Sequence, residues 1–158
     1  MKDKLIKIVN KMIENNKTIS TMESCTGGGL ANIITNIKGA SKILHFSAVT
    51  YSNEYKIKMG VSKKVIDEYS VYSLETAREM AKAISKFSKS NLGIGITGKL
   101  GVKDTNNSFG DDNTVYACIY NADENKYNDL VVKVNSKDRK DDKKEVLEDI
   151  VDFLNEYV

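Results

Sequence analysis

The sequence contains no proline, no tryptophan and only one histidine among its 158 residues. It has only two cysteines, Cys25 and Cys118, which are too few for a disulfide framework or a zinc site. No hydrophobic run approaches the roughly 20 residues that a membrane-spanning helix requires. The opening segment, MKDKLIKIVNKMIENNK, spreads its charges through an amphipathic pattern and does not resemble a signal peptide. We therefore expect a cytoplasmic protein without a membrane partner.

An excess of one sign of charge is also lacking, because the formal net charge is only +2 and acidic residues balance the lysines along most of the chain. No basic face stands out, which argues against a nucleic-acid partner. The lack of proline, together with abundant lysine, asparagine and isoleucine, is typical of a biased genome composition and indicates no function. A length of 158 residues fits one domain with its own core, spanning residues 1–158.

The spacing of apolar residues predicts helices and strands in alternation. Helical spacing indicates helices at residues 5–13, 30–37, 74–87 and 146–154. Apolar and β-branched runs indicate strands at residues 18–22, 43–51, 92–96, 114–120 and 129–134. This order implies an α/β fold, a three-layer α/β/α sandwich with helices on both faces of the sheet. The last two strands form an antiparallel hairpin across the polar segment 121–128, so the sheet is mixed but mostly parallel.

Capping residues predict where several helices begin and end. Gly39 is expected to cap the C-terminus of the second helix, and Ser73 the N-terminus of the third. Asp142 and Glu145 have the spacing of a capping box, so the last helix is expected to open there. The polar segment 103–113 is most simply an exposed loop.

A glycine-rich turn, ESCTGGG, connects the first strand to the second helix at residues 23–29. In open α/β sheets, ligands usually bind beside the carboxyl ends of the strands. Glycines allow a ligand to approach the backbone closely, and the free N–H groups of a helix N-terminus attract an anion. That anion could be a phosphate, or the oxyanion that forms when a carbonyl carbon is attacked. The turn alone is compatible with both, and also with a structural role in which its hydroxyls only cap the helix.

The turn offers three candidate nucleophiles, Ser24, Cys25 and Thr26. A thiol at a helix N-terminus has a lowered pKa, which favours Cys25. However, a cysteine hydrolase usually needs a histidine base, and we interpret the only histidine, His45, as an ordinary residue in the middle of a strand. Ser24 or Thr26 would also need a base, and a lysine is the natural substitute for histidine.

A second segment, VTYSNEYK at residues 49–56, should emerge at the same edge of the sheet. Ser52 or Asn53 can cap a short helix, which would place Lys56 near its first turn. The helix dipole and partial burial would both lower the pKa of Lys56, so that a neutral amine could accept a proton. Tyr51 could donate a hydrogen bond or relay a proton. The alternative is that Lys56 is solvated and Tyr51 only packs.

Four segments, ESCTGG, VTYSNEYK, SVYSLETAREMA and GITG, occur in the order found in the C-terminal domain of the CinA competence/damage-inducible proteins. The chain resembles this family, which includes stand-alone nicotinamide mononucleotide (NMN) amidohydrolases, and it resembles the stand-alone form. The resemblance implies a three-layer α/β/α fold with a mixed sheet. It also implies hydrolysis of NMN to nicotinate mononucleotide and ammonia in pyridine-nucleotide salvage, without a metal or organic cofactor, and a homodimer.

By motif position, the resemblance implies that Ser24 is the nucleophile, Lys56 its base and Tyr51 an assisting hydroxyl. Cys25 would be a neighbour of the substrate. The backbone N–H groups of Thr26, Gly27 and Gly28 would hold an oxyanion or a phosphate.

Two further parts of the chain carry weaker resemblances. Thr97 and Gly98 belong to the GITG segment and would border the substrate. Arg139, in SKDR, resembles the arginine of the family's Gly-Asp-Arg and would contact phosphate, unless it lies on a solvated face.

The chain departs from the family pattern directly after GITG. The family usually continues with Ile-Ala-Gly-Pro and further glycines, whereas this chain has Lys99, Leu100 and Gly101 followed by a polar segment. This departure favours an alternative function, a catalytically silent module that binds a phosphorylated nucleotide. Thiol chemistry through Cys25 is a third hypothesis.

Overall fold

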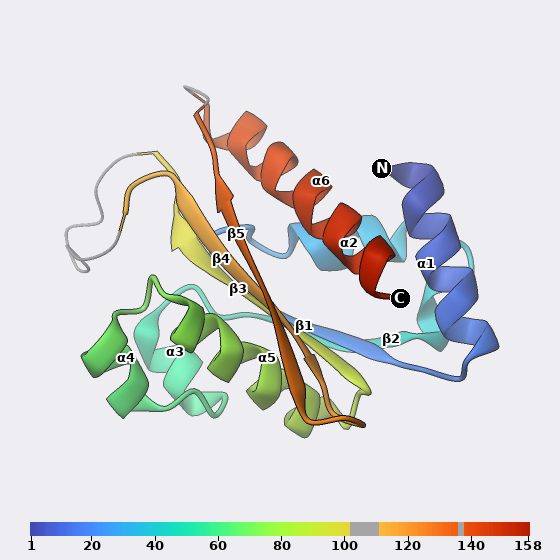
Figure 1. Ribbon diagram of the computed structural model, residues 1–158, viewed down its shortest axis with the longest axis horizontal. Coiled ribbons are helices and arrows are strands. Elements are labelled where there is room, and N and C mark those ends of the chain that lie inside the picture. The colour runs from blue at the N-terminus through green and yellow to red at the C-terminus, as the bar shows by residue number, and fades with distance from the viewer. Residues whose placement is uncertain (102–110, 136–137) are drawn as a thin grey trace.

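A computed structural model describes residues 1–101, 111–135 and 138–158 of the chain. Its centre is a five-stranded sheet in the order β2-β1-β3-β4-β5 (Figure 1). The strands are β1 (Ile19–Glu23), β2 (Leu44–Val49), β3 (Leu92–Lys99), β4 (Thr114–Asn121) and β5 (Lys126–Lys133). All five predicted strands are therefore present, with ends that differ from the predicted ones by a few residues.

The sheet is mixed, as predicted. β1 pairs in parallel with both β2 and β3, whereas β4 is antiparallel to β3 and to β5. Only β4 runs against the others, so the sheet is mostly parallel in strand direction. Most paired residues are nevertheless antiparallel, because β3, β4 and β5 are each 8 residues long and β1 has only 5.

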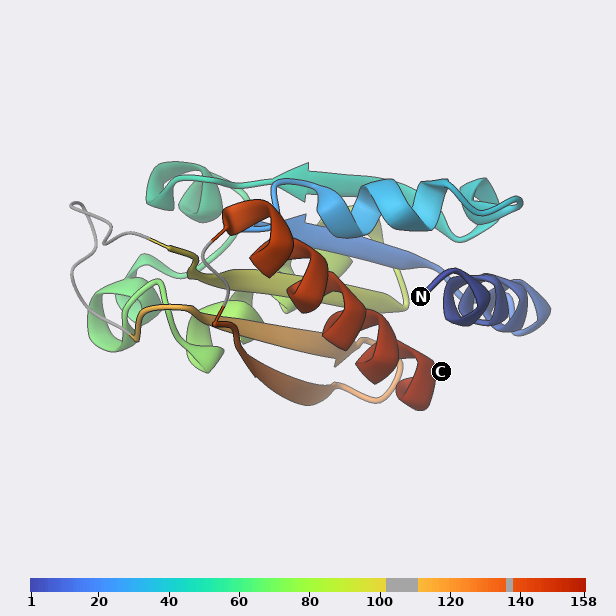
Figure 2. The ribbon, with the colours of Figure 1, turned by 90° about the horizontal axis from the view of Figure 1, so that it is seen from above.

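Helices cover both faces of the sheet, which confirms the three-layer α/β/α fold (Figures 1 and 2). One face carries α1 (Lys2–Glu14), α2 (Gly29–Thr35) and α6 (Arg139–Tyr157). The other face carries α3 (Asn53–Lys58), α4 (Lys63–Tyr69) and α5 (Leu74–Ser88). Across the described part of the chain, we find no helix with the length and apolar character needed to cross a bilayer.

Three predictions about helices are wrong. The last helix begins at Arg139, with Asp138 as its N-cap, so Asp142 lies buried inside the first turns rather than at the cap. Gly39 does not cap α2, which ends at Thr35; instead Gly39, at φ 91°, precedes a short 3₁₀ turn, η1 (Ala40–Lys42). The apolar spacing over residues 74–87 also predicts Phe87 on the buried face of the third helix, whereas Phe87 is exposed on α5. The N-cap predicted at Ser73 is confirmed, because its side chain accepts a hydrogen bond from Thr76 N–H.

Glycines on β3 let α5 lie against the backbone of the strand. A Cβ atom added at Gly95 would lie 2.6 Å from Ala81 N and would overlap the carbonyl oxygen of Ala77. A Cβ atom at Gly93, two residues earlier in β3, would likewise overlap the backbone of α5. The alternating glycines of LGIGITG are therefore required by packing, because any side chain there would push the helix off the sheet.

This close approach predicts a large effect of one methyl group. We expect Gly95→Ala to lower the free energy of unfolding by about 3 kcal/mol, because the obstacle is backbone that cannot turn aside. Gly29→Ala is the matched control, since its Cβ would meet only Leu147 Cδ1, the end of a flexible side chain, at 2.9 Å. We expect Gly29→Ala to lower the free energy of unfolding by less than about 1 kcal/mol. Urea unfolding followed by circular dichroism measures both losses, and equal losses would contradict the explanation.

Candidate active site

The glycine turn follows the carboxyl end of β1, as the sequence predicts. Ser24 N–H donates to Ile96 O at 3.0 Å, so the first residue of the turn is attached to β3. The chain then reverses through Gly27 and Gly28, whose φ angles are 64° and 88°. Both angles lie in the left-handed region, where glycine is favoured because it has no Cβ atom. The Gly-Gly pair is therefore required by the geometry of the turn.

Lys56 and Ser24 meet in the interior beside this turn. Lys56 Nζ lies 3.0 Å from Ser24 Oγ and donates to Thr50 O at 2.7 Å. Lys56 is only 2% exposed, and Ser24 is buried as well. The two side chains are thus within hydrogen-bond distance of one another in the interior, which is the geometry that a nucleophile and its base require.

The helix that carries Lys56 begins as predicted. Ser52 is the N-cap of α3, and its hydroxyl accepts a hydrogen bond from Tyr55 N–H at 3.3 Å. Thr50, two residues before the Ser52 cap, links Lys56 to the end of β1. Its N–H donates to Glu23 O at 2.9 Å, while its carbonyl accepts from Lys56 Nζ. The position of Lys56 is thus tied to the end of β1 through Thr50.

Glu23 is the residue of the motif that the sequence pattern leaves without a role. Its side chain is fully buried. Oε1 accepts from Thr26 Oγ1 at 2.7 Å and from Leu30 N–H at 2.9 Å. Oε2 accepts from Thr21 Oγ1 at 3.0 Å and from Ala31 N–H at 2.9 Å. The signal that could have revealed it is an acidic residue placed just before a turn and a helix whose first N–H groups need acceptors.

Not every N–H group of the turn donates to an acceptor within the described part of the protein. Among the described residues, the N–H groups of Thr26 and Gly28 have no hydrogen-bond acceptor, whereas Gly27 N–H donates to Ser24 O and Gly29 N–H to Thr26 O. Free backbone donors next to a serine hydroxyl have the character of an oxyanion hole.

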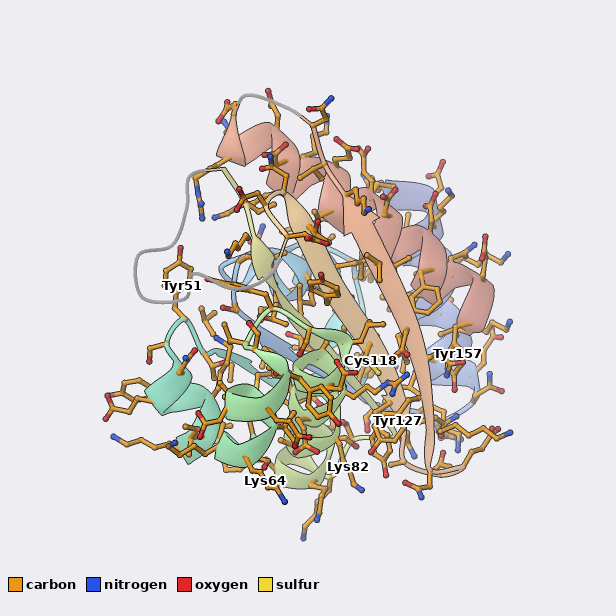
Figure 3. The ribbon with its side chains drawn as sticks, turned by 60° about the vertical axis from the view of Figure 1, so that its left-hand side comes forward. Tyr51, Lys64, Lys82, Cys118, Tyr127 and Tyr157 are labelled. Atoms are coloured by element: carbon orange, nitrogen blue, oxygen red, sulfur yellow. The ribbon has the colours of Figure 1, made fainter. Side chains whose placement is uncertain are left out.

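The side chain of Tyr51 lies at the surface. It is 66% exposed and projects from the molecule (Figure 3). Its hydroxyl accepts a hydrogen bond from Arg139 Nη2 at 3.3 Å, and Arg139 Nη1 donates to Leu100 O. The structure therefore brings the predicted Tyr51 and Arg139 together, although 88 positions separate them in the chain.

A second cation, Lys143, lies one helical turn after Arg139 on α6. Its Nζ atom would be 3.5 Å from a Cβ added at Gly27, so the ammonium group lies directly over the turn. Lys143 is not among the residues that the motifs predict, because it is one of several lysines in a charged run. Its signal is the spacing of four from Arg139, which places both side chains on one face of a helix.

The remaining candidates are held mainly by structural contacts. Thr97 is buried, and its hydroxyl donates to Val71 O at 2.9 Å. A Cβ at Gly98 would lie 2.5 Å from Thr114 O, so glycine is needed there for the pairing of β3 with β4. His45 is exposed on β2. The segment after Gly101 that departs from the family pattern lies outside the described residues through residue 110.

Cys25 is in an environment that disfavours a thiolate. It is 4% exposed, and burial raises the pKa of its thiol to about 12. Its own backbone, Lys56 and Arg139 act in the opposite direction and offset only part of this effect. A nucleophilic cysteine requires a lowered pKa, so the geometry does not favour thiol chemistry.

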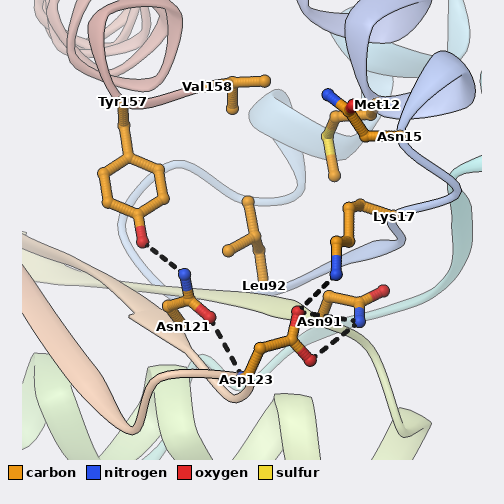
Figure 4. A pocket seen from close by; sticks show the side chains of 9 residues that line it. All are labelled: Met12, Asn15, Lys17, Asn91, Leu92, Asn121, Asp123, Tyr157 and Val158. Atoms are coloured by element: carbon orange, nitrogen blue, oxygen red, sulfur yellow. Dashed lines mark hydrogen bonds and ion pairs between the residues drawn. The ribbon is translucent and has the colours of Figure 1, made fainter.

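A separate pocket of about 260 Å³ lies at the opposite end of β1 and β3, where α1 and α6 end (Figure 4). Lys17 and Asp123 form an ion pair at 2.8 Å on its rim, and Asn121 donates to Tyr157 Oη at 2.7 Å. These polar groups are paired with one another. In the ranges that the structure describes, no group of three or more His, Cys, Asp and Glu side chains could hold a metal ion.

Comparisons with known proteins agree on one family. The family model described as the CinA C-terminal domain matches residues 2–158. A competence-damage inducible protein of Clostridium perfringens is 46% identical over 99 residues, which are 61% of this chain and 24% of that protein. One from Clostridium botulinum is 45% identical over 95 residues, 60% of this chain and 23% of that protein. The matched region thus spans about a quarter of the length of these relatives.

Solved structures show the same fold. A CinA superfamily protein from Escherichia coli has a TM-score of 0.91 at 22% identity, covering 99% of this chain and 90% of that one. The competence/damage inducible protein CihA from Agrobacterium tumefaciens has a TM-score of 0.87 at 22% identity, covering 97% and 92%. At this identity the likeness extends to the fold alone.

The burial of Cys25 predicts slow alkylation. A pKa of about 12 in place of 9.0 leaves about 1,000-fold less thiolate near neutral pH, so native protein should resist iodoacetamide at Cys25. The same protein in denaturant should be labelled quickly at both cysteines. Mass spectrometry of peptides from a labelling time course measures the two rates. Fast labelling of Cys25 in the native protein would revive the thiol hypothesis.

Proposed function

The chain belongs to the family of CinA C-terminal domains, and we propose that it is a serine amidohydrolase that converts NMN and water into nicotinate mononucleotide and ammonia. The observation that carries this proposal is the buried contact of 3.0 Å between Lys56 Nζ and Ser24 Oγ. A serine hydroxyl needs a base to become nucleophilic, and a desolvated lysine is one of the few groups that can act as one.

In the proposed reaction, Ser24 Oγ attacks the carboxamide carbon while its proton passes to Lys56 Nζ. The tetrahedral intermediate carries its negative charge on the former carbonyl oxygen, which the N–H groups of Thr26 and Gly28 would stabilise. Lys56 then protonates the amide nitrogen, the C–N bond breaks and ammonia leaves an acyl-enzyme. Lys56 next takes a proton from water, whose hydroxide attacks the ester carbonyl. Lys56 then gives that proton to Ser24 Oγ as the ester bond breaks, which releases nicotinate mononucleotide and restores the serine hydroxyl. The hydrogen bond to Thr50 O keeps the amine in line throughout.

The cations of α6 suit a phosphorylated substrate. Lys143 lies over Gly27 of the turn, and Arg139, on the same face of the helix, lies beside Gly101 and Tyr51. Lys56 contacts Ser24. Charged hydrogen bonds of this kind are the usual way of holding a phosphate monoester. We assign Arg139, with Lys143 beside it, to the phosphate of NMN, and Cys25, Thr97 and Gly98 to the wall of the site. Tyr51, bonded to Arg139, would then border the substrate rather than activate the serine.

The alternative function is a catalytically silent module that binds a phosphorylated nucleotide. The observation that favours it is Lys99, whose buried side chain stands over the ring of Tyr72 where the family pattern has an isoleucine. Saturable binding of NMN measured by calorimetry, without release of ammonia, would select this alternative. The role in pyridine-nucleotide salvage, the cytoplasmic location and the homodimer remain predictions, and sedimentation equilibrium would test the last.

Hydrolysis of NMN by the purified protein tests the proposed reaction. We expect ammonia release by the wild type and a loss of about 1,000-fold or more in kcat for Ser24→Ala and Lys56→Met. Ser20→Ala and Lys17→Met are matched controls, because Ser20 bonds to Ser90 inside the sheet and Lys17 pairs with Asp123 at the opposite edge. Both should retain activity. An inactive wild type would exclude the substrate, and an active Ser24→Ala variant would exclude the nucleophile.

The phosphate assignment predicts a binding effect of Arg139. We expect Arg139→Met to raise KM for NMN by about 10-fold or more, because a hydrogen bond to a charged group is lost. Hydrolysis of nicotinamide riboside, which lacks the phosphate, should change little. The chain's other described arginine supplies the control, since Arg78→Met breaks only the pair with Asp129. Equal losses with both substrates would contradict the assignment.

A further inference from the structure

We infer that Glu23 is a positioning residue for the Ser24 nucleophile, acting through the turn that its carboxylate ties to the start of α2. This role rests on the proposed serine chemistry. Glu23 is the last residue of β1 and directly precedes Ser24, yet its side chain is fully buried and bonds only to residues of β1, the turn and α2 among those described. It would act on the reaction only through the backbone of the turn.

The Glu23 carboxyl group accepts hydrogen bonds from residues that precede Ser24 in the sequence and from residues that follow it. Thr21 lies before the serine in β1, whereas Thr26, Leu30 and Ala31 follow it. All four donors are uncharged hydroxyl or N–H groups, at 2.7 to 3.0 Å. The turn is therefore closed by one carboxyl group, whose two oxygens accept all four hydrogen bonds.

The turn has few other means of holding its shape. Gly27 and Gly28 carry no side chains, and Gly28, the N-cap of α2, cannot provide a side-chain cap. Glu23 supplies the missing cap from outside the helix, since it accepts from Leu30 and Ala31 N–H. Thr26, whose N–H is one of the available donors, is bonded to Glu23 through its hydroxyl. The carboxylate thus orients both the serine and the donors proposed for the oxyanion.

Lys56 is positioned by separate hydrogen bonds, and a change in the Glu23 side chain leaves these in place. The backbone carbonyl of Glu23 accepts from Thr50 N–H, and Thr50 O accepts from Lys56 Nζ. Substitution of the side chain would therefore shift the serine relative to its base rather than move both together. A displacement of about 1 Å in a catalytic group costs about 100-fold in rate. We therefore expect a loss in kcat with little change in KM.

Glu23→Gln is the direct test. Glutamine keeps the volume but has one acceptor oxygen, and its amide N–H groups would face donors. We expect kcat for NMN to fall about 10-fold or more, with KM within about twofold, because the phosphate contacts are unaffected. The rate at which a fluorophosphonate labels Ser24, followed by mass spectrometry, should fall by a similar factor. Thermal unfolding of each variant shows whether the protein is folded at the assay temperature.

Two threonines that bond to the same carboxylate form a matched pair. Thr26→Val and Thr21→Val each remove one hydroxyl donor to Glu23 with little change in shape, but only Thr26 lies in the turn. We expect Thr26→Val to slow Ser24 labelling and Thr26→Ser, which keeps the hydroxyl, to restore it. Thr21→Val should lower stability and leave the labelling rate near that of the wild type. If Glu23→Gln does not fold, this pair decides the question.

The outcomes separate positioning from the proposed function. A wild type whose Ser24 is labelled but which does not hydrolyse NMN contradicts the substrate, and the labelling rates of the variants still decide the role of Glu23. Equal labelling of wild type, Glu23→Gln and Thr26→Val overturns positioning while leaving the amidohydrolase in place. Equal slowing by both valine variants also overturns it, because a general loss of stability would then explain the effect. No labelling of wild-type Ser24 overturns both proposals.

Discussion

The buried contact between Lys56 and Ser24 is the constraint on which the site depends. An amine is taken out of water only if its partners lie at defined positions, and here these include a serine hydroxyl and the carbonyl oxygen of Thr50. Three parts of the chain must therefore meet at one point. They are the carboxyl end of β1, the residue after β2 and the first turns of α3. The parallel pairing of β1 with β2 brings the first two together, and the Ser52 cap starts the third at the correct residue.

The sheet and its glycines prepare this point in different ways. On β3, glycines let α5 pack against the strand backbone. This packing fixes the position of the part of β3 whose carbonyl oxygen accepts the hydrogen bond from Ser24 N–H. In the turn, Gly27 and Gly28 permit left-handed backbone. The same residue type therefore serves helix packing on β3 and a tight reversal of the chain before α2. Glu23 joins the two regions, because it ends β1 opposite Ile96 of β3 and its side chain holds the turn.

Much of the fold could be predicted from the sequence because its signals are local. Periodicity identified every strand and the longer helices, and Ser52 and Ser73 marked helix starts by their own hydrogen bonds to the backbone. The start of α6 was not predictable in the same way, since its charged first turns hide the periodicity and two acidic residues compete as caps. The short helix α4 was missed because one or two turns carry too few apolar residues to form a pattern.

The sequence by itself determined the chemistry that is possible: a hydroxyl before a glycine turn, a lysine that follows the neighbouring strand, and an α/β sheet whose strand ends meet at one edge. Only the tertiary structure decided which groups meet. It buries Cys25 and so disfavours its thiolate, places Tyr51 at the surface with Arg139, and sets Lys143 over Gly27. It also encloses the Glu23 carboxylate among donors from four residues. Burial and long-range contact cause the first three outcomes, and neither is a property of a residue's sequence neighbours. The donors to Glu23 are 2 to 8 positions away in the sequence, and the fold of the turn brings them to one carboxyl group.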